Sequence, residues 1–424
     1  MSFVNKRNPN AGQYFPRQEP AIGAAYPTSD FPQNEHLPKL FQPITIGGLT
    51  FKNRAFVSPM CQYSADNGHA TDWHLVHIGG FVTRGAGAVV VEATAVVPEG
   101  RISPEDLGLW ADSQIEPLKR IVNFAHGHDT LIGIQLAHAG RKASALAPWI
   151  YENAPKTVKA PRHLALEDDN GWPNNVYGPS DIPFGEDYAK PIVMTKEDIQ
   201  RVEDAYIAAV ERCKQIGFDF IEIHAAHGYL LSSFLSPMTN TRTDDFGGQS
   251  LENRMRWPLR LIKRVREAWS DKPLFVRISG TEWAGDERDG HGRWLSWGLE
   301  QSKIFTAEVQ KIGVDLIDVS SGGNYPKQEI PTTPGYQVYL ADGVKKALPE
   351  IKVGTVGLIF DGKQANDYLE EGKADVIFLG REFLRDPHFV LRAALELGTP
   401  VNSAGQYQRA WTRLWKPQSP SSHL

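Results

Sequence analysis

Two imidazoles and a phenol stand together immediately after an apolar stretch in the middle of the chain. The stretch is Phe218–Ile223, and the cluster is His224-Ala225-Ala226-His227-Gly228-Tyr229. The apolar run is typical of a buried β-strand, so we expect the three polar rings where a strand ends and a loop begins. Two imidazoles can donate hydrogen bonds to one oxygen, and a nearby phenol can deliver a proton. This combination suits the activation of a carbonyl compound.

Short β-branched runs alternate with amphipathic segments along the body of the chain. A repeating strand-then-helix order favours an α/β protein with a parallel sheet. About eight such units predict a (β/α)8 TIM barrel, in which reactive groups stand at the C-terminal ends of the strands. Helical patterns such as Ile199–Gln215 and Leu251–Ala268 lie between the strands. The predicted strands are Arg54–Ser58, Ala88–Glu92, Leu131–Leu136, Phe218–His224, Leu274–Ile278, Val314–Val319, Lys352–Val356 and Val376–Leu379.

Three segments interrupt this alternation. Residues 1–40, rich in Pro, Asn and Gln, predict an extended N-terminal arm before a barrel over residues 41–411, with a flexible tail over 412–424. Ala145–Pro191 is too long for an ordinary connection after the third strand, so we expect a lid or binding loop there. Gly280–Trp297 follows the fifth strand and is a second loop expected near the site. Surface decoration is the alternative for both long segments.

Composition limits the class of protein. The 424-residue chain has 45 basic and 50 acidic side chains, a formal net charge of −5 that disfavours a nucleic-acid-binding surface. Cys61 and Cys213 are too few for an iron–sulfur cluster held by four thiolates, and they suit a reducing compartment. No apolar run approaches the roughly 18 residues of a membrane helix. We therefore expect a cytoplasmic protein without a membrane partner. The terminal Ser422-His423-Leu424 resembles the Ser-Lys-Leu peroxisomal signal, with a frayed polar tail as the alternative.

The last strands of the predicted barrel end in a pattern typical of a phosphate site. Gly322 follows the sixth strand, Gly357 the seventh, and Gly380 with Arg381 the eighth. Glycine lets backbone N–H groups approach a phosphate closely, and a guanidinium adds a bidentate charge. Because glycine is common in such turns anyway, the pairing with Arg381 is what indicates a phosphate.

Strands one, three and five supply a different set of groups, Cys61, Gln135 and Arg277. An amide beside a guanidinium can recognise a flat heterocycle with alternating donors and acceptors. A buried arginine also stabilises a ring that gains negative charge. Together with the phosphate end, this set predicts FMN across the barrel mouth. Taken singly, Arg277 is also compatible with a core ion pair, and Gln135 with a satisfied polar core residue.

Two other kinds of site fit the sequence less well. A metal at His224 and His227 would need further ligands from other strand ends, but strands one and five to eight end in other residue types. We expect no metal, and we interpret His74 and His77 as helix packing residues. No Gly-x-Gly-x-x-Gly follows a strand, so no Rossmann site is predicted. NADPH or NADH is therefore expected to dock transiently as a co-substrate.

Three motifs together resemble the old yellow enzyme family of FMN-dependent ene-reductases, in its thermophilic-like branch. They are Ser-Pro-Met-Cys-x-Tyr at 58–63, Gln-Leu-Ala-His-Ala-Gly-Arg-Lys at 135–142 and His-x-x-His-Gly-Tyr at 224–229. The resemblance runs from about Leu40 to about Trp411. It implies a barrel that binds FMN, takes a hydride from NADPH or NADH, and reduces the activated C=C bond of α,β-unsaturated carbonyl compounds.

The resemblance also implies roles for single residues. Tyr63, His224 and His227 match groups that hold the substrate carbonyl, and Tyr229 matches the proton donor. Arg409 matches an arginine that enters the neighbouring subunit's site, which implies a homo-oligomer; an exposed tail charge is the alternative. The implied FMN-binding residues are Ser58, Pro59, Met60, Cys61, Ala93, Gln135, Arg277, Gly357, Gly380 and Arg381, to which position at the phosphate end adds Gly322.

Two further functions use the same residues. The flavin site can serve a redox-neutral isomerisation in a natural-product pathway, and a barrel can also be retained for binding alone. The N-terminal arm and Ala145–Pro191 are longer than in compact members of the family. These departures affect the expected substrate shape and subunit arrangement rather than the chemistry.

Overall fold

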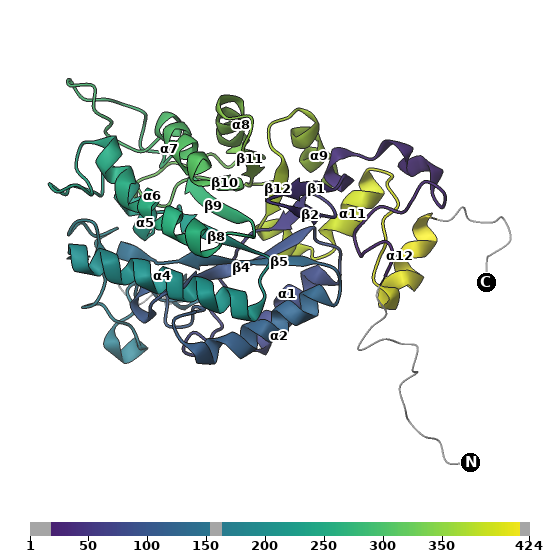
Figure 1. The fold of residues 1–424 in the computed structure, drawn as a ribbon, viewed down its shortest axis with the longest axis horizontal. Helices are drawn as coiled ribbons and strands as arrows, with labels where there is room; N and C mark the ends of the chain where they lie inside the picture. The colour runs from purple at the N-terminus through teal and green to yellow at the C-terminus, as the bar shows by residue number, and fades with distance from the viewer. Residues whose placement is uncertain (1–17, 153–162, 416–424) are drawn as a thin grey trace, which may run out of the picture.

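Eight parallel strands close into a barrel in this computed structural model, with helices around the outside (Figure 1). The structure describes residues 18–152 and 163–415. Barrel strands that follow one another along the chain are also neighbours in the barrel. The last strand closes on the first, with Ile377 paired to Ala55. The barrel strands are β3 (Ala55–Val57), β4 (Ala88–Ala95), β5 (Leu131–Ala137), β8 (Phe220–Ala225), β9 (Leu274–Ser279), β10 (Leu316–Ser320), β11 (Lys352–Thr355) and β12 (Val376–Leu379). The predicted (β/α)8 fold is confirmed.

The observed strands overlap all of the predicted ones and differ only at their ends. Three aspartates lie directly before strands, and two of them, Asp219 and Asp315, fall inside predicted strands that begin later in the structure. Asp219, Asp315 and Asp375 each precede a strand, and each carboxylate accepts a backbone N–H from the preceding strand of the barrel, at 2.8 Å, 2.8 Å and 2.9 Å respectively. These residues therefore satisfy backbone N–H groups at the N-terminal ends of the neighbouring strands through their side chains, and are not themselves part of a strand.

The helices cover the barrel in the order that the strand-then-helix pattern predicts. The predicted Ile199–Gln215 lies within α4, which begins at a cap where Thr195 Oγ1 accepts the Asp198 N–H and ends at Gly217, φ +95°. The longer helices are α1 (Asp72–Val82), α2 (Ile115–His126), α4 (Lys196–Ile216), α6 (Leu251–Ala268), α7 (Leu299–Ile312), α8 (Val338–Ala347) and α9 (Gly362–Glu370). The shorter ones are α3 (Pro148–Glu152), α5 (Leu230–Leu235), α10 (Arg381–Arg385), α11 (Phe389–Glu396) and α12 (Gln408–Trp415).

The interior of the barrel divides into an apolar layer and a polar layer. Phe56, Phe220, Phe275 and Phe378 fill the end where the strands begin, and Phe51 from the hairpin of β1 (Ile44–Ile46) and β2 (Leu49–Phe51) packs against them. Each such buried ring contributes roughly 1.5–3 kcal/mol. Two residues further along the strands, inward positions carry Glu222, Arg277 and Asp318, all buried. The strands thus place polar groups where they end.

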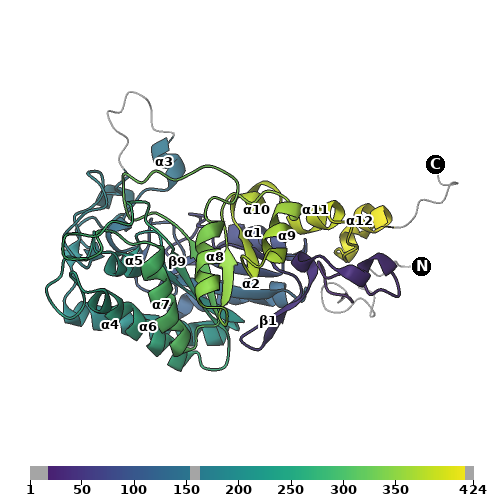
Figure 2. The same ribbon diagram turned by 90° about the horizontal axis from the view of Figure 1, so that it is seen from above.

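The first described segment of the chain packs beside the barrel against residues near 400 (Figure 2). Ala25 forms a bridge with Val401, and the Gly23 N–H donates to the Asn402 carbonyl at 2.8 Å. The described part of the predicted arm also contains short 3₁₀ helices at Pro32–His36 and Lys39–Phe41. The predicted boundary at residue 412 falls inside α12, whose Trp411 stacks on His388. Residues 416–424, with the Ser422-His423-Leu424 terminus, lie outside the described residues.

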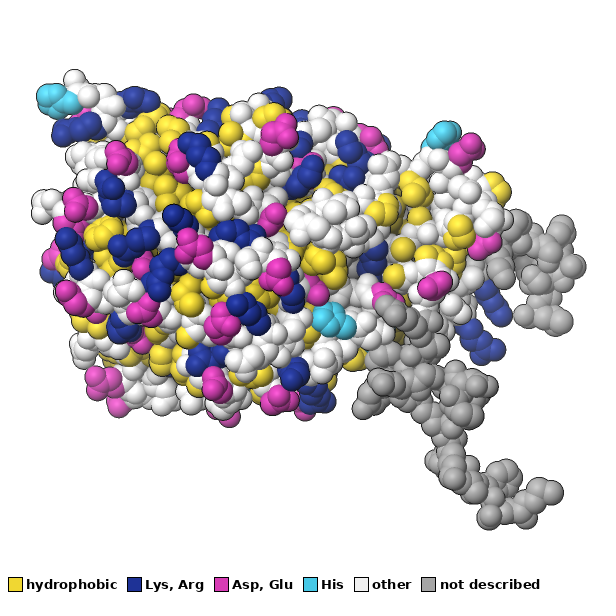
Figure 3. Space-filling model, viewed as in Figure 1, with side chains coloured by type: hydrophobic (Ala, Val, Ile, Leu, Met, Phe, Trp, Pro, Cys, Tyr) yellow, Lys and Arg dark blue, Asp and Glu magenta, His cyan; other side chains and the backbone are white. Residues whose placement is uncertain are grey.

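The surface mixes charges of both signs. On the face drawn in Figure 3, basic and acidic side chains alternate with apolar ones over the helices. Across residues 18–152 and 163–415, no helix is long and apolar enough to cross a membrane.

Candidate active site

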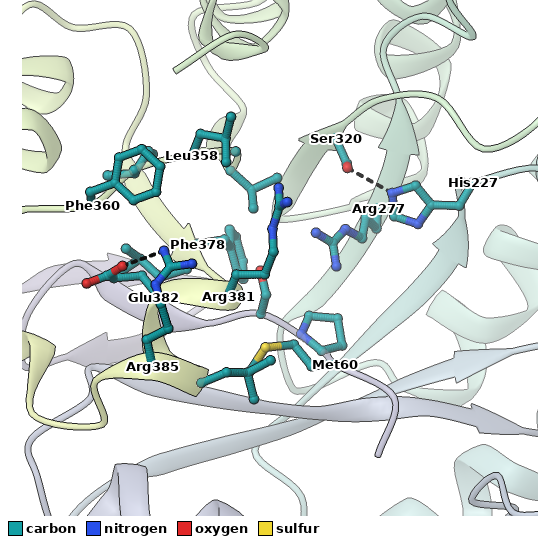
Figure 4. A pocket seen from close by; sticks show the side chains of 18 residues that line it. Met60, His227, Arg277, Ser320, Leu358, Phe360, Phe378, Arg381, Glu382 and Arg385 are labelled. Carbon is teal, nitrogen blue, oxygen red and sulfur yellow. Dashed lines mark hydrogen bonds and ion pairs between the residues drawn. The ribbon is translucent and has the colours of Figure 1, made fainter. Parts of the chain in front are cut away.

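A pocket of about 250 Å³ opens where β3, β9, β10, β11 and β12 end. Arg277 from β9 and Arg381 from the start of α10 face this space, and His227 and Ser320, which are hydrogen-bonded to each other, also line it (Figure 4). The pocket brings together eight of the predicted residues: Ser58, Pro59, Met60, His227, Arg277, Gly357, Gly380 and Arg381. Leu358, Phe360 and Arg385 also line it and were not predicted, because they lie beyond the glycine turns that carried the prediction.

The two glycines at the phosphate end differ in what the protein requires of them. Gly357 has φ +119°, and a Cβ there would lie 2.7 Å from the Gln337 side chain, so the chain itself requires glycine. At Gly380 a Cβ would lie 3.6 Å from Met60 Sδ, which is ordinary contact. Packing within the protein therefore explains Gly357 but not Gly380, and close approach of a ligand is the remaining reason for glycine at 380.

The polar groups of the pocket fit a phosphorylated flat ring such as FMN. Ser58 Oγ is buried and has no hydrogen-bond partner among the described residues. Two guanidinium groups, Arg277 and Arg381, line the same cavity, and the second stands at the start of α10 beside Gly380. The buried Ser58 hydroxyl and Arg277 guanidinium, together with the exposed Arg381, can donate to an acceptor, and a phosphate with a polar heterocycle supplies several.

The floor of the pocket is a buried array of charges. Arg277 Nε lies 3.0 Å from Asp318 Oδ2, and Gln135 Nε2 donates to Glu222 Oε1 at 2.7 Å. Within the chain, therefore, Arg277 has the ion pair and Gln135 the satisfied core contact that we named as alternatives, although Arg277 also lines the pocket. Burial and the nearby Asp318 raise the pKa of Glu222, which favours the neutral form of this carboxyl beside the Asp318 carboxyl.

His224 and His227 lie with their rings perpendicular and close together. His227 Nδ1 is 3.4 Å from His224 Nε2, and His227 Nε2 is 2.8 Å from Ser320 Oγ. His224 Nδ1 accepts the Ala226 N–H, which assigns the proton of its neutral ring to Nε2. Burial, together with the positive charges of Arg277 and Lys142, lowers the pKa of both rings well below the usual value. Both imidazoles are therefore neutral donors at physiological pH.

The loop that carries His227 is fastened to the loop after β10. Lys142 Nζ donates to the His227 carbonyl at 3.1 Å and to the Gly323 carbonyl at 3.0 Å. Ser279 Oγ accepts the His227 N–H and donates to the Gly322 carbonyl, both at 2.9 Å. Gly322 therefore joins loops and does not line the main pocket. Lys142 belongs to a motif used for the resemblance, but sequence spacing did not reveal its position under the histidine loop.

Tyr229 lies at the start of α5 and lines a small cavity separate from the main pocket. Ala93 and Asp106 line this cavity too. The Tyr229 ring packs at 4.9 Å, edge to face, against the ring of His224, which brings the phenol beside the imidazole pair. Burial raises the pKa of Tyr229 well above its usual value, so the phenol holds its proton at neutral pH.

The loop after β3 carries two further predicted residues, Cys61 and Tyr63. Burial, with the nearby Asp106 and Glu92, raises the pKa of the Cys61 thiol well above its usual value, so the group is a neutral thiol. Tyr63 adopts φ +49°, and its ring packs edge to face on Trp149 at 5.5 Å. The long insertion therefore contacts the predicted substrate-binding residues through Trp149.

The rest of the described insertion is bound to the barrel. Ser144 Oγ donates to the Ala165 carbonyl at 2.8 Å, and Trp172 Nε1 donates to the Glu99 carbonyl at 3.0 Å. Arg141 donates to the Pro183 carbonyl at 3.0 Å. These contacts fix the residues from 163 onward, while residues 153–162 of the predicted lid lie outside the described part of the chain.

The second long loop, Gly280–Trp297, borders the loop after β10, and none of its residues lines the main pocket. Trp283 Nε1 donates to Ser321 Oγ at 2.9 Å, and the buried carboxylate of Glu282 accepts Asn324 Nδ2 at 2.6 Å.

Three other predicted positions lie away from the pocket. Arg409 is exposed on α12 and does not line the cavity. His74 accepts the Thr71 N–H at 3.0 Å, and the ring of His77 packs on Phe81 at 4.7 Å, so both serve helix α1 as interpreted. Among the residues that the structure describes, no group of three or more His, Cys, Asp or Glu side chains is placed to hold a metal ion.

An arginine-lined pocket with glycine turns and a neutral imidazole pair at the mouth of a parallel barrel fits a flavin-dependent oxidoreductase. The profile of the NADH:flavin oxidoreductase / NADH oxidase family matches residues 39–399. An NADH:flavin oxidoreductase of Gibberella zeae is 46% identical over 403 residues, which cover 93% of each chain. An NADPH dehydrogenase of Bacillus licheniformis is 42% identical over 380 residues, 88% of this chain and 99% of the relative. The solved structure of morphinone reductase has a TM-score of 0.66 at 22% identity, over 86% of this chain and 91% of that one, and supports the fold.

The chain belongs to the NADH:flavin oxidoreductase / NADH oxidase family, and its likeness to NADPH dehydrogenases confirms the resemblance to the old yellow enzyme family. It is an oxidoreductase whose cofactor is FMN and whose co-substrate is a nicotinamide nucleotide.

Proposed function

We propose that the enzyme reduces the activated C=C bond of α,β-unsaturated carbonyl compounds. The observation that carries this proposal is the convergence of the two imidazoles. His224 Nε2, which carries the proton of its ring, lies 3.4 Å from His227 Nδ1 and can donate to it; a substrate oxygen placed between the two rings would accept from both nitrogens when the Ser320 hydroxyl donates to His227 Nε2 and leaves the His227 proton on Nδ1. Two neutral N–H donors aimed at one point suit a carbonyl oxygen that gains negative charge in the transition state.

The cofactor site defines the other half of the reaction. Gly357, Gly380 and Arg381 would hold the phosphate of FMN, and Arg277 with Gln135 would hold its ring, with Ser58 donating from the first strand. When bound, FMN supplies the hydride for the β-carbon of the substrate. The remaining named residues, Pro59, Met60, Cys61 and Ala93, would contact the ring through backbone and apolar atoms.

Tyr229 completes the reaction by delivering a proton to the α-carbon. Its raised pKa keeps the phenol protonated, and its contact with His224 places it beside the carbonyl clamp. The test is a comparison of the two half-reactions in Tyr229→Phe. We expect alkene reduction to slow by roughly 10²–10⁴-fold while flavin reduction by NADPH is unchanged. If both half-reactions slowed equally, or if neither slowed, Tyr229 would not be the proton donor.

The substrate site extends to the insertion and, by this proposal, to a second subunit. Tyr63 would contact the substrate, and Trp149 beside it would limit substrate size as part of the Ala145–Pro191 lid. Arg409, exposed on α12, would reach the site of a neighbouring copy in a homo-oligomer. Arg409→Ala should then raise the KM for enones without altering FMN content, whereas an unchanged KM would leave Arg409 a surface charge.

A further inference from the structure

Lys142 is a partly buried ammonium that the reaction described above does not use. Two of its three N–H donors go to the His227 and Gly323 carbonyls. Nζ also lies 5.2 Å from the centroid of the Tyr229 ring and 4.4 Å from that of Phe184. Within the described residues, no carboxylate lies at ion-pair distance from this ammonium, so its charge is not neutralised locally.

We propose that the Lys142 ammonium stabilises the tyrosinate that forms when Tyr229 gives its proton to the substrate. In that step the Tyr229 O–H bond breaks, a C–H bond forms at the α-carbon, and one negative charge stays on the phenolate until solvent returns the proton. The inference rests on the proposed function, because it assigns Lys142 an effect that acts only through Tyr229. Lys142 is thus a positioning residue that acts on this step through its charge.

Electrostatics explain why such a charge is needed at this place. Burial, followed by the nearby Cys61, Tyr63 and Asp106, raises the pKa of Tyr229, which makes its phenol a poorer acid. A unit positive charge 5.2 Å from the centre of the ring, in surroundings with an effective dielectric constant near 20, favours the phenolate by roughly 10²-fold. The rate benefits from part of this factor, so we expect a tenfold to hundredfold effect on proton transfer.

The same charge predicts a pH dependence of its own. Burial and the adjacent Arg141 lower the pKa of Lys142 to about 7. The titratable groups that face it are Arg141, His224, His227 and Tyr229; the histidines are neutral and the phenol is protonated near pH 7. Lys142 is therefore charged below about pH 7 and neutral above it, and alkene reduction should slow as the pH rises through that value.

The experiment measures single-turnover alkene reduction by the pre-reduced holoenzyme across this pH range. Lys142→Met should lower the rate roughly tenfold to hundredfold and remove the pH dependence. Lys142→Arg keeps a positive charge at all these pH values, so its rate of alkene reduction should match that of the unaltered enzyme at low pH and should not change with pH. Lys52→Met is the matched control, because Lys52 is a second buried lysine with a pKa lowered to about 7 but is bonded to Thr130 at the other end of the barrel.

A cycle with Tyr229→Phe separates the possible failures. If Lys142 acts through the phenol, adding Lys142→Met to Tyr229→Phe should not slow alkene reduction further. The inference would be overturned if Lys142→Met slowed alkene reduction fully in the Tyr229→Phe background, or if Lys142→Arg were as slow as Lys142→Met. Lys142 would then only hold the two loops together. If Tyr229→Phe alone leaves alkene reduction unchanged, the proposed function itself is wrong at the proton donor.

Discussion

The contact between the loop that carries His227 and the loop after β10 can be tested by adding one methyl group at Gly323. Gly323 has φ +87°, and a Cβ there would lie 2.6 Å from both the Cα and the carbonyl oxygen of His227. Ordinary contact begins at 3.4 Å, so Gly323→Ala requires the two backbones to separate by about 0.8 Å. Because both clashing partners are backbone atoms, no rotamer change can relieve the contact.

The expected cost has two parts. A left-handed conformation costs a residue with a Cβ roughly 1–2 kcal/mol, and overpacking costs typically 1–3 kcal/mol more. Gly48→Ala isolates the first part, since Gly48 has φ +85° and nothing within 4 Å of its Cβ position. Denaturant unfolding should therefore show Gly323→Ala less stable than Gly48→Ala by about 1–3 kcal/mol.

Activity should distinguish the two glycines more sharply. Displacing His227 by nearly 1 Å moves one donor of the carbonyl clamp, and misplacement on that scale can cost about 10²-fold. We expect Gly323→Ala to retain FMN, to bind a small phenol more weakly, and to lose about 10²-fold in enone turnover. Gly48→Ala should match the unaltered enzyme in both assays. If the two variants behaved alike, the idea that loop contact positions His227 would be refuted.

Four further outcomes follow from the same structure. Arg381→Ala should weaken FMN binding by a few kcal/mol, the scale of a charge-assisted contact, and full flavin retention through dialysis would contradict its role. The double variant His224→Ala/His227→Ala should stay yellow and lose phenol binding; an unchanged phenol Kd would refute the clamp. Lys52 has a folded-state pKa of about 7, below its unfolded value of 10.5. Between these pH values the unfolded chain binds more protons than the folded one, so the free energy of unfolding should rise with pH. Lys52→Met should flatten this rise when unfolding is measured against pH. Trp149→Ala should shift relative activity toward bulky enones, whereas uniform scaling of all substrates would contradict a size limit.

Sequence patterns could predict the strands and the residues at their ends, because both follow from local chemistry. Gly357, Gly380 and Arg381 were found this way, since the carboxyl ends of parallel strands meet at one face. The contacts among the buried side chains beneath these residues could not be predicted in this way. Arg277 contacts Asp318 because β9 and β10 pair in a particular register, and register depends on packing around the whole barrel.

Contacts between loops were also beyond prediction. Lys142 fastens His227 to Gly323 across segments about 85 and 180 residues apart in the chain, through backbone carbonyls that any residue type offers. Arg141 binds the insertion at Pro183 in the same way. Sequence shows which side chains are able to donate, but only the folded chain shows which carbonyl receives the bond.

The two interior layers of the barrel explain how one set of strands carries both stability and chemistry. On β9, Phe275 points into the apolar layer and Arg277, two residues later, into the polar floor of the pocket. The apolar layer packs without regard to the ligand, while the polar layer holds groups such as Arg277 and Glu222 where the strands end. Truncating Phe275 should therefore cost about 3–5 kcal/mol of stability and leave substrate preference unchanged. Substitution of Arg277 should weaken FMN binding and should also cost stability, because it leaves the buried Asp318 carboxyl without its ion-pair partner.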